Sequence, residues 1–312
     1  MAEGIHMTVV SIIGLGAIGA AHAARIADSS PATQVRVVAA GARAERLRTD
    51  GVVVNGTRHL FPVVEPGDPV DPADLVIVAV KHHHLAEAIG QLAGHVGPGT
   101  VLLSLLNGIT SEEELAAAYP QASVPLAVSV GIDAVRDADG VRFTSLGRVE
   151  FGDAVAGEPS TGVRRLEELL TECAIPYIVR PDMIHTLWWK FLINTGVNQV
   201  SALLEAPYRV FQAEGPARDL MISAQREVVA VAQASGVDLT AADIDEFLDV
   251  LAKLGPGNYT SMAQDALAHR RTEVDQFAGT IVALGDRYGV ETPVNRVLLE
   301  AFLAKHQLWG VA

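Results

Sequence analysis

Short, continuous apolar runs alternate with helical patterns through the first third of the chain. These runs lie at Thr8–Ile13, Val35–Ala39, Leu75–Val80 and Val101–Leu105, each bounded by turn or helix signals. Continuous rather than alternating hydrophobicity is typical of parallel strands that are covered on both faces. The pattern therefore predicts βαβ units around a parallel sheet.

The pattern of hydrophobic and polar residues changes after this region. Residues 124–152 form β-rich segments with polar turns, and the Asp-Gly pair in VRDADGVRF predicts a hairpin. A helix at LEELL and a strand at IPYIV follow, but after Pro181 the pattern is almost entirely helical, with breaks at GVDLT, LGPGNYT and YGVETP. We therefore expect an α/β protein with an N-terminal Rossmann-type dinucleotide-binding domain over 8–180 and a mainly helical C-terminal domain over 181–312.

Length, composition and charge indicate the size of the core and the kind of binding partner. A chain of 312 residues with 49% hydrophobic content is long enough to bury a large core in two domains. Asp and Glu number 37 against 23 Lys and Arg, a formal charge of −14, which argues against nucleic acid or an anionic membrane as a partner and favours a small molecule. The sequence leaves a homodimer open.

No apolar run approaches the ~20 residues that span a bilayer, and no cleavable signal pattern is visible, so we expect a cytoplasmic protein. The single cysteine, Cys173, excludes an internal disulfide and is interpreted as a small buried hydrophobe rather than a nucleophile.

The first strand pattern ends in a glycine-rich turn that opens a helix. GLGAIG is a full GxGxxG, in which the first glycine permits a tight turn, the second lets backbone amides approach a pyrophosphate and the third allows close helix packing. Its position after a strand and before a helix favours dinucleotide binding over a purely structural turn. The predicted cofactor contacts are Gly14, Leu15, Gly16, Ala17, Ile18 and Gly19.

The end of the second strand favours a phosphorylated cofactor. NAD-preferring sites usually have an acidic residue there, but this chain has Ala39 and Ala40, followed by Arg43, Arg46 and Arg48. An arginine can meet the 2′-phosphate of NADP(H), and Arg43 is the best placed of the three; the other two are interpreted mainly as helix surface.

Two further strand ends are candidates for the ligand crevice. Lys81 follows LVIVAV, and Asn107 with Gly108 follows the next strand. His82–His84 resemble a metal site, but consecutive histidines rarely converge on one ion, so we expect no metal. Asn107 could also belong to a simple Asn-Gly turn.

A polar stripe crosses an otherwise apolar segment of the helical region. In LWWKFLINTGVNQVSAL, Lys190, Asn194 and Asn198 are four residues apart and would share one face of a helix. An ammonium can stabilise and protonate an oxygen that becomes negative during a reaction, and neutral amides can hydrogen-bond a ligand without adding charge.

The sequence resembles the ketopantoate reductase family, the NADPH-dependent 2-dehydropantoate 2-reductases of pantothenate synthesis. The resemblance runs from about Thr8 to near the carboxyl terminus and is carried by GLGAIG, AVKHHH, LLNG, LWWKFLINTGVNQVSAL and YTSMAQDALAHRRTEVDQFAGTIV. It implies a Rossmann domain and a helical domain with the active site in the cleft between them.

The resemblance also implies residue roles. Lys190 would be the catalytic proton donor, Glu273 would lie near the reacting ends of cofactor and substrate, and Asn107 would lie beside the nicotinamide ribose and the substrate. Asn194, Asn198 and Ser261 would be substrate ligands. Ala134 would contact the cofactor through its backbone.

Taken singly, these residues also have ordinary structural interpretations. Lys190 could be a surface lysine, Asn194 and Asn198 interhelical hydrogen-bonding residues, Ser261 a helix N-cap, and Glu273 a solvated partner of Arg270 or Arg271. Their combined spacing favours the active site.

The sequence departs from the family at two positions. Ala40 stands where an arginine is common, and Tyr208 stands where some members have a further substrate-binding asparagine. The alternative functions are therefore reduction of another 2-oxo acid or related carbonyl compound, and dinucleotide sensing without catalysis. Lys190 and Glu273 argue against a sensor, which would need neither.

Overall fold

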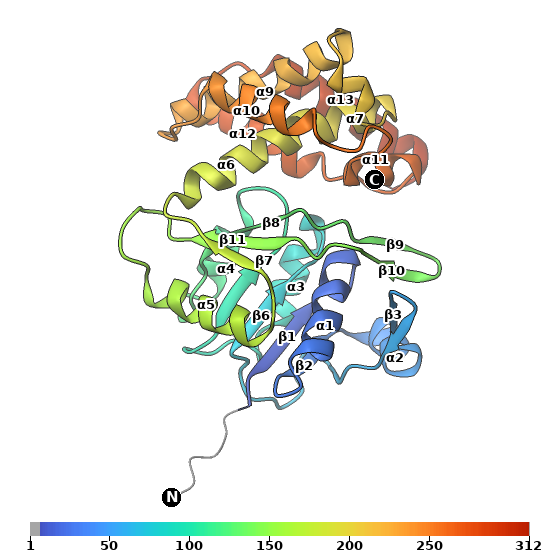
Figure 1. The fold of residues 1–312 in the computed structure, drawn as a ribbon, viewed down its shortest axis with the longest axis vertical. Helices are drawn as coiled ribbons and strands as arrows, with labels where there is room; N and C mark the ends of the chain where they lie inside the picture. The colour runs from blue at the N-terminus through green and yellow to red at the C-terminus, as the bar shows by residue number, and fades with distance from the viewer. Residues whose placement is uncertain (1–6, 312) are drawn as a thin grey trace, which may run out of the picture. The chain divides into compact units, whose positions relative to one another are not determined.

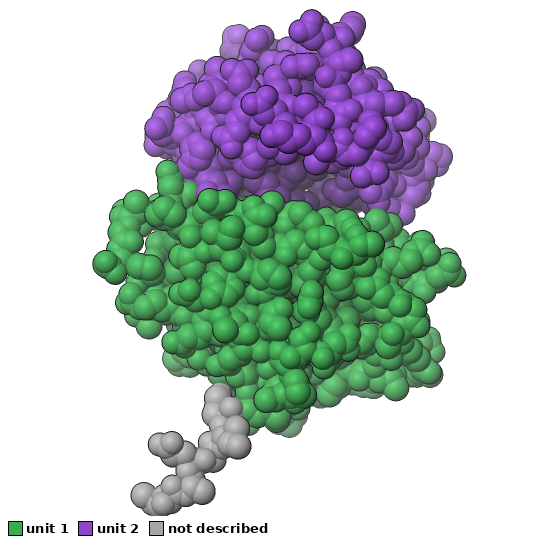
Figure 2. Space-filling view, in the orientation of Figure 1, with its two compact units in different colours: residues 1–106, 110–184 green, residues 107–109, 185–312 purple. Residues whose placement is uncertain are grey.

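The computed structural model describes residues 7–311 and divides by its contacts into two compact units. Unit 1 runs to Leu106 and resumes over Thr110–Ile184, whereas unit 2 comprises Asn107–Ile109 and the chain from His185 onward (Figure 2). The second unit begins after residue 184, whereas the sequence pattern predicted a boundary near residue 180. The inclusion of Asn107–Ile109 in unit 2 is a feature that the pattern did not predict.

A five-stranded parallel sheet in the order β5-β2-β1-β6-β7 forms the centre of unit 1 (Figure 1). Its strands are β1 (Val9–Ile13), β2 (Gln34–Val38), β5 (Val63–Val64), β6 (Leu75–Val78) and β7 (Val101–Ser104). The chain winds outward from β1 in one direction and from β6 in the other, so the switch point of the sheet lies between these two strands. Ligands of such sheets bind beyond the carboxyl ends of the strands at this point.

Helices cover both faces of the sheet, which explains why its strands are continuously apolar. One core joins the sheet to α1 (Ala17–Ser29) and α5 (Thr161–Glu172). The opposite core joins it to α3 (Leu85–Gln91) and α4 (Ser111–Ala118). Cys173 belongs to the first core, where burial raises the pKa of its thiol to about 12, so it is an unreactive buried side chain at neutral pH.

Two smaller sheets complete unit 1. The predicted Asp-Gly hairpin is formed by β9 (Val135–Asp137) and β10 (Gly140–Arg142), and β10 pairs with β3 in a four-stranded sheet of order β4-β3-β10-β9. A three-stranded sheet has the order β12-β11-β8. The other elements of unit 1 are α2 (Gly41–Asp50), β3 (Val52–Val54), β4 (Thr57–His59), η1 (His82–His84), β8 (Leu126–Val130), β11 (Arg148–Gly152) and β12 (Tyr177–Val179).

The described residues beyond Val179 contain helices and turns but no strand. They are α6 (Met183–Ile193), η2 (Asn194–Asn198), α7 (Gln199–Leu204), α8 (Arg209–Gln212), α9 (Pro216–Ala234), α10 (Ala241–Leu251), α11 (Ser261–Leu267), η3 (Asp275–Gly279), α12 (Thr280–Tyr288) and α13 (Pro293–Trp309). The fold class expected from the sequence, a Rossmann-type α/β region followed by a helical region, is confirmed. Among the described helices, none combines the length and the apolar composition required to cross a membrane.

Candidate active site

The glycine loop joins β1 to α1 and leaves room above the start of the helix. Gly14 has a φ of +94°, and a Cβ there would lie 2.6 Å from the backbone of Ala79. A Cβ at Gly19 would lie 2.1 Å from the Gly14 carbonyl oxygen, so both positions require glycine. Gly16, by contrast, faces open space and is the N-cap of α1 without a side-chain hydrogen bond. The first N–H groups of α1 are thus available to an anionic ligand.

Arg136 contacts this loop, and its positive charge acts on Arg43 together with that of Arg46. Arg43 is in the first turn of α2, and the pKa of its guanidinium is lowered by partial loss of hydration and by the positive charges of Arg136 and Arg46. Arg136 is on β9 and donates a hydrogen bond to the Leu15 carbonyl oxygen within the glycine loop. Like charges this close repel each other, and a bound phosphate would relieve that repulsion.

The sequence pattern does not single out Arg136, because residue 136 lies at the glycine loop through long-range pairing of its hairpin with β3. Ala134, the predicted backbone contact, lies two residues earlier and packs, partly buried, against the same core as the loop.

Arg48 has a different partner from the other arginines of α2. Its Nη1 lies 2.6 Å from Oε1 of Glu65, and the Gly41 N–H donates to Oε2 of the same carboxylate at 3.2 Å. These contacts lower the pKa of Glu65, the Arg48 hydrogen bond most strongly. Arg48 is therefore a surface partner of Glu65, in agreement with its interpretation from the sequence.

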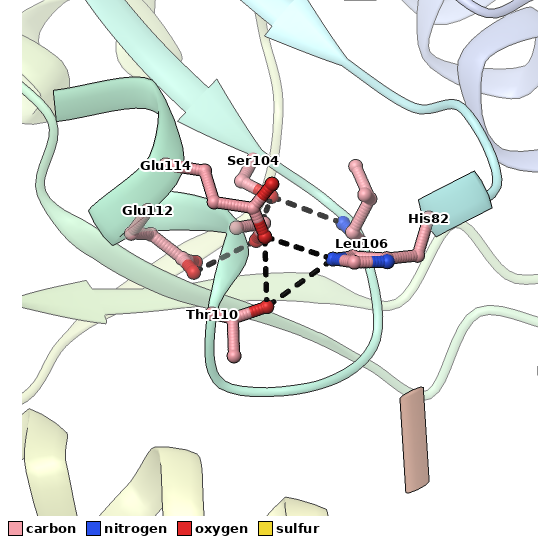
Figure 3. A network of polar contacts seen from close by, with 7 residues as sticks. His82, Ser104, Leu106, Thr110, Glu112 and Glu114 are labelled. Carbon is pink, nitrogen blue, oxygen red and sulfur yellow. Dashed lines mark hydrogen bonds and ion pairs between the residues drawn. The ribbon is translucent and has the colours of Figure 1, made fainter. Parts of the chain in front are cut away.

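Figure 3 shows the polar network that fixes the segments after β6 and β7. His82 Nε2 lies 3.0 Å from Glu114 Oε1 and 3.2 Å from Thr110 Oγ1. Ser104 and Ser111 share a hydrogen bond of 2.8 Å, and Ser111 also donates to the buried Glu112 at 2.8 Å. The network ties the turn that begins at Lys81 to the start of α4.

The three consecutive histidines do not converge on a common point in this turn. His82 faces Glu114, whereas the rings of His83 and His84 contact each other with centroids 4.2 Å apart. Within residues 7–311, no group of three or more His, Cys, Asp or Glu side chains has an arrangement that could hold a metal ion.

Four of the predicted site residues form a continuous hydrogen-bonded series in unit 2, called the amide ladder below. Asn198 Nδ2 donates to Asn194 Oδ1 at 3.2 Å, Asn194 Nδ2 to Asn107 Oδ1 at 3.5 Å, and Asn107 Nδ2 to Glu273 Oε2 at 3.4 Å. Asn194, Asn198 and Glu273 are each 7% exposed. The ladder presents donors and acceptors to a ligand without adding positive charge, and it ends on one carboxylate.

Two helical segments next to the ladder residues are distorted into π-helix. η2 includes Asn194 and Asn198, and η3 begins two residues after Glu273. π-helical turns are rare and often occur at functional sites, because the wider turn redirects side chains and frees backbone groups. The sequence pattern predicted helix here but not this distortion.

Lys190 lies in the last turn of α6, four residues before Asn194, and is half-buried. The helix therefore places its side chain on the face that continues into the amide ladder. Lys190 has at least one interaction partner in the structure, so it is not an isolated charge.

Ser261 is the exposed first residue of α11. The N-cap role proposed for it belongs instead to Thr260, whose hydroxyl accepts from the Ala263 N–H at 3.1 Å. A hydrogen bond of 2.7 Å joins the hydroxyls of Thr260 and Ser201, and Ser201 also donates to the Asn198 carbonyl oxygen. The start of α11 is thus fixed to the segment that carries Asn198.

The arginines suggested as partners of Glu273 pair elsewhere. Arg270 bonds to Asp265 with an Nε to Oδ1 distance of 2.9 Å, and Arg271 lies 3.2 Å from Asp275. Glu273 is buried rather than solvated, so the ordinary surface interpretation of this residue is wrong.

Two family models match consecutive parts of the chain. The family described as "Ketopantoate reductase PanE/ApbA" matches residues 10–156, and "Ketopantoate reductase PanE/ApbA C terminal" matches residues 182–306. A "2-dehydropantoate 2-reductase" of Pyrobaculum aerophilum is 31% identical over 242 residues, covering 78% of this chain and 80% of the relative.

Solved structures share the fold over almost the whole chain. A D-mandelate dehydrogenase, solved with NADH and anilino(oxo)acetate, superimposes with a TM-score of 0.86 at 22% identity, covering 98% of this chain and 100% of that one. A dimeric ketopantoate reductase from Staphylococcus aureus gives a TM-score of 0.79 at 21% identity, covering 97% and 100%. The family matches and the Pyrobaculum relative together show that the chain belongs to the ketopantoate reductase family.

Proposed function

We propose that the protein is an NADPH-dependent oxidoreductase that reduces 2-dehydropantoate to pantoate. The observation that carries the proposal is the amide ladder, a buried set of neutral hydrogen-bonding groups next to Lys190 in a chain of this family. 2-Dehydropantoate has one negative charge, a hydroxyl and a ketone, and such groups need several hydrogen bonds and one cation. The pathway would be pantothenate and coenzyme A synthesis.

The dinucleotide would be held by unit 1. The room above Gly16 and the first N–H groups of α1 suit a pyrophosphate, and Lys81 at the end of β6 is a further cofactor contact. When bound, NADPH supplies the hydride that reduces C2 of the 2-oxo acid.

The residues of unit 2 would act on the substrate. As C2 gains hydride, the ketone oxygen becomes negative, and the Lys190 ammonium stabilises this charge and donates the proton that completes the alcohol. Asn194, Asn198 and Ser261 would orient the carboxylate and hydroxyl groups, while Asn107 and Glu273 would fix the reacting ends. This division of roles accounts for each polar side chain that the ladder contains.

NADP(H) is proposed over NAD(H) because Arg136 hydrogen-bonds to the glycine loop and its positive charge acts on Arg43. Recognition of a ribose 2′-hydroxyl commonly uses a carboxylate near the end of the second strand. The carboxylate found near this position is Glu65, and its charge is already balanced by Arg48. The D-mandelate dehydrogenase solved with NADH makes NAD(H) the alternative cofactor.

A second candidate function is the reduction of another 2-oxo acid, and Tyr208 is the residue that favours it. This tyrosine is half-buried, and burial raises the pKa of its phenol, so it remains an uncharged aromatic group at neutral pH. An aromatic side chain in place of an asparagine suits a less polar substrate.

The deciding experiment is NADPH oxidation measured with a panel of 2-oxo acids that includes 2-dehydropantoate and benzoylformate. Preferred reduction of 2-dehydropantoate supports the proposal, whereas preference for an aryl acid supports the second candidate. Tight NADPH binding without reduction of any acid would instead support a sensing role.

Two further expectations remain proposals. We expect a cytoplasmic enzyme, and we expect a homodimer, as described for the Staphylococcus aureus ketopantoate reductase. Light scattering of the purified protein measures the oligomeric state directly.

A further inference from the structure

Gln199 connects the two π-helical segments of unit 2. It follows η2 directly and is completely buried. Its Nε2 donates to the Thr195 carbonyl oxygen within η2 at 2.6 Å, and its Oε1 accepts from the Ala278 N–H within η3 at 3.1 Å. One side-chain amide therefore hydrogen-bonds to the backbone of both segments.

The distortion of η3 explains why such a bridge is needed. The Gly279 N–H donates to the Val274 carbonyl oxygen five residues earlier, which is the π-helical pattern. The N–H of the preceding residue, Ala278, donates to Gln199 instead. A buried N–H without an acceptor is costly, so the Gln199 amide stabilises the π-helical form of η3.

A second amide fixes the orientation of Gln199. Asn295, which is also fully buried, accepts from Gln199 Nε2 at 3.2 Å and donates to Glu227 Oε2 at 2.8 Å. Glu227 in turn accepts from the N–H groups of Val294 and Asn295 at 2.7 and 2.9 Å, in the first turn of α13. Because the carboxylate only accepts, the orientation of both amides is determined.

The amide ladder depends on the spacing of the same two segments. Asn194 and Asn198 are in η2, whereas Glu273 immediately precedes the residue that caps η3. Two of the ladder contacts are 3.4 and 3.5 Å long, so a small displacement of either segment would break them.

We propose that Gln199 is a positioning residue for catalysis, which keeps the asparagines of η2 in register with Glu273. This inference rests on the proposed function, because it assigns Gln199 to that reaction. A displacement of about 1 Å at a reacting group can reduce the rate about 100-fold, so the effect on turnover can be large although Gln199 is not itself assigned a contact with the substrate.

The chain offers a matched control in Gln225. This glutamine is also completely buried and packs against Gly196 of η2, with its Cγ 2.5 Å from the position a Cβ would take. Neither polar atom of its side chain has a hydrogen-bond partner among the residues that the structure describes. Replacement of Gln225 by methionine therefore changes the packing at η2 without removing a bridge.

The test compares Gln199→Met with Gln225→Met in the full-length protein. We expect Gln199→Met to lower kcat/KM for 2-dehydropantoate by about 10- to 100-fold, whereas the Kd for NADPH stays within about twofold. Gln225→Met should keep kcat/KM within about threefold, because no hydrogen bond is lost. Equal effects of the two substitutions, or an equal fall in NADPH affinity, would show that Gln199 has only a general structural role.

Two further measurements apply if Gln199→Met does not fold or if the wild-type protein reduces no 2-oxo acid. If Gln199→Met fails to fold, Asn295→Ala removes the group that orients Gln199 and should give a smaller loss, about 3- to 10-fold, in the same parameter; a kcat/KM equal to that of the wild type would contradict the inference. If the wild-type protein reduces no 2-oxo acid, the proposed function fails, and crystal structures of the two glutamine variants then decide. An unchanged amide ladder in Gln199→Met would contradict the positioning role.

Discussion

Lys190 lies in the helical turn that precedes η2 and the amide ladder. In this turn and in η2 it is the one residue with a cationic side chain that can donate a proton. We expect Lys190→Ala to lower kcat by about 10²- to 10⁴-fold, which is the usual effect of removing a general acid. The dissociation constant for NADPH, measured by fluorescence titration, should change little, since the glycine loop is in unit 1. An unchanged kcat would remove Lys190 from the mechanism.

Arg43 and Arg136 give a second prediction for single residues. Each replacement by alanine should weaken NADPH binding by roughly 10- to 100-fold, because a hydrogen bond to a charged group contributes about 1.5–3 kcal/mol. NADH binding should change far less, since NADH lacks the 2′-phosphate. Arg48→Ala is the control, because Arg48 is already paired with Glu65. Equal losses for both cofactors would contradict the assignment.

Residues of the site differ in how far the sequence could predict them. Lys190, Asn194 and Asn198 stand out because they are polar residues at helical spacing in an apolar segment. Arg136 and Gln199 have no such local signal, because Arg136 bonds to the glycine loop 121 residues earlier and Gln199 bonds to η3, 79 residues later. Long-range hydrogen bonds of this kind are set by tertiary packing, which periodicity does not report.

The glycine loop allows a prediction for an element as a whole. A methyl group at position 16 meets no protein atom, whereas one at position 19 overlaps the Gly14 carbonyl oxygen. Gly16→Ala should therefore keep the melting temperature within a few degrees and weaken dinucleotide binding. Gly19→Ala should lower the unfolding free energy by about 1–3 kcal/mol, the usual cost of overpacking.

Thermal melting with and without NADPH distinguishes the two roles. A Gly16→Ala protein that binds NADPH as tightly as the wild type would show that the ligand does not approach this part of the loop. A Gly19→Ala protein as stable as the wild type would show that α1 can shift away from β1.

The positions of strands and of the hairpin could be predicted from the sequence pattern. The π-helical distortions could not. β1, β6 and β7 lie within the predicted apolar runs, and the Asp-Gly pair forms the predicted hairpin. The π-helical segments η2 and η3 contain no residue that marks them in the sequence, because the wider turn is stabilised by contacts such as the Gln199 bridge.

The stability of the molecule should depend on pH through two buried histidines. His22 and His95 are 1% and 2% exposed, and the pKa of each is lowered from 6.5 to about 4, by burial above all and, for His95, also by the positive charge of Arg36. Because the unfolded chain then binds more protons between pH 6.5 and 4, the native state loses stability as the pH falls through this range. Each histidine should reduce the unfolding free energy by about 2 kcal/mol between pH 7 and pH 5.

Urea unfolding at pH 7 and pH 5 measures this loss. His95→Gln should show a drop smaller by about 2 kcal/mol than the wild type, since the titrating group is gone. An equal drop in the variant would mean that His95 does not control the acid sensitivity.

At the scale of the whole chain, alternation of strand and helix patterns was sufficient to predict a Rossmann-type region and a helical region. The pattern could not assign Asn107–Ile109 to unit 2, because this short segment lies between β7 and α4 of unit 1 along the chain. Its assignment follows from contacts such as that between Asn107 and Glu273. The order of elements in the sequence thus predicts the architecture, but it does not predict that residues 107–109 group with unit 2.

The amide ladder has a direction. At each step an Nδ2 donates toward Glu273, so the three side-chain dipoles are aligned and end on a negative charge. A carboxylate can only accept, which leaves Asn107 a single orientation, and this choice passes to Asn194 and then to Asn198. A glutamine at position 273 could donate as well as accept, and all three amides could then turn over. One carboxylate therefore sets the orientation of an amide three hydrogen bonds away.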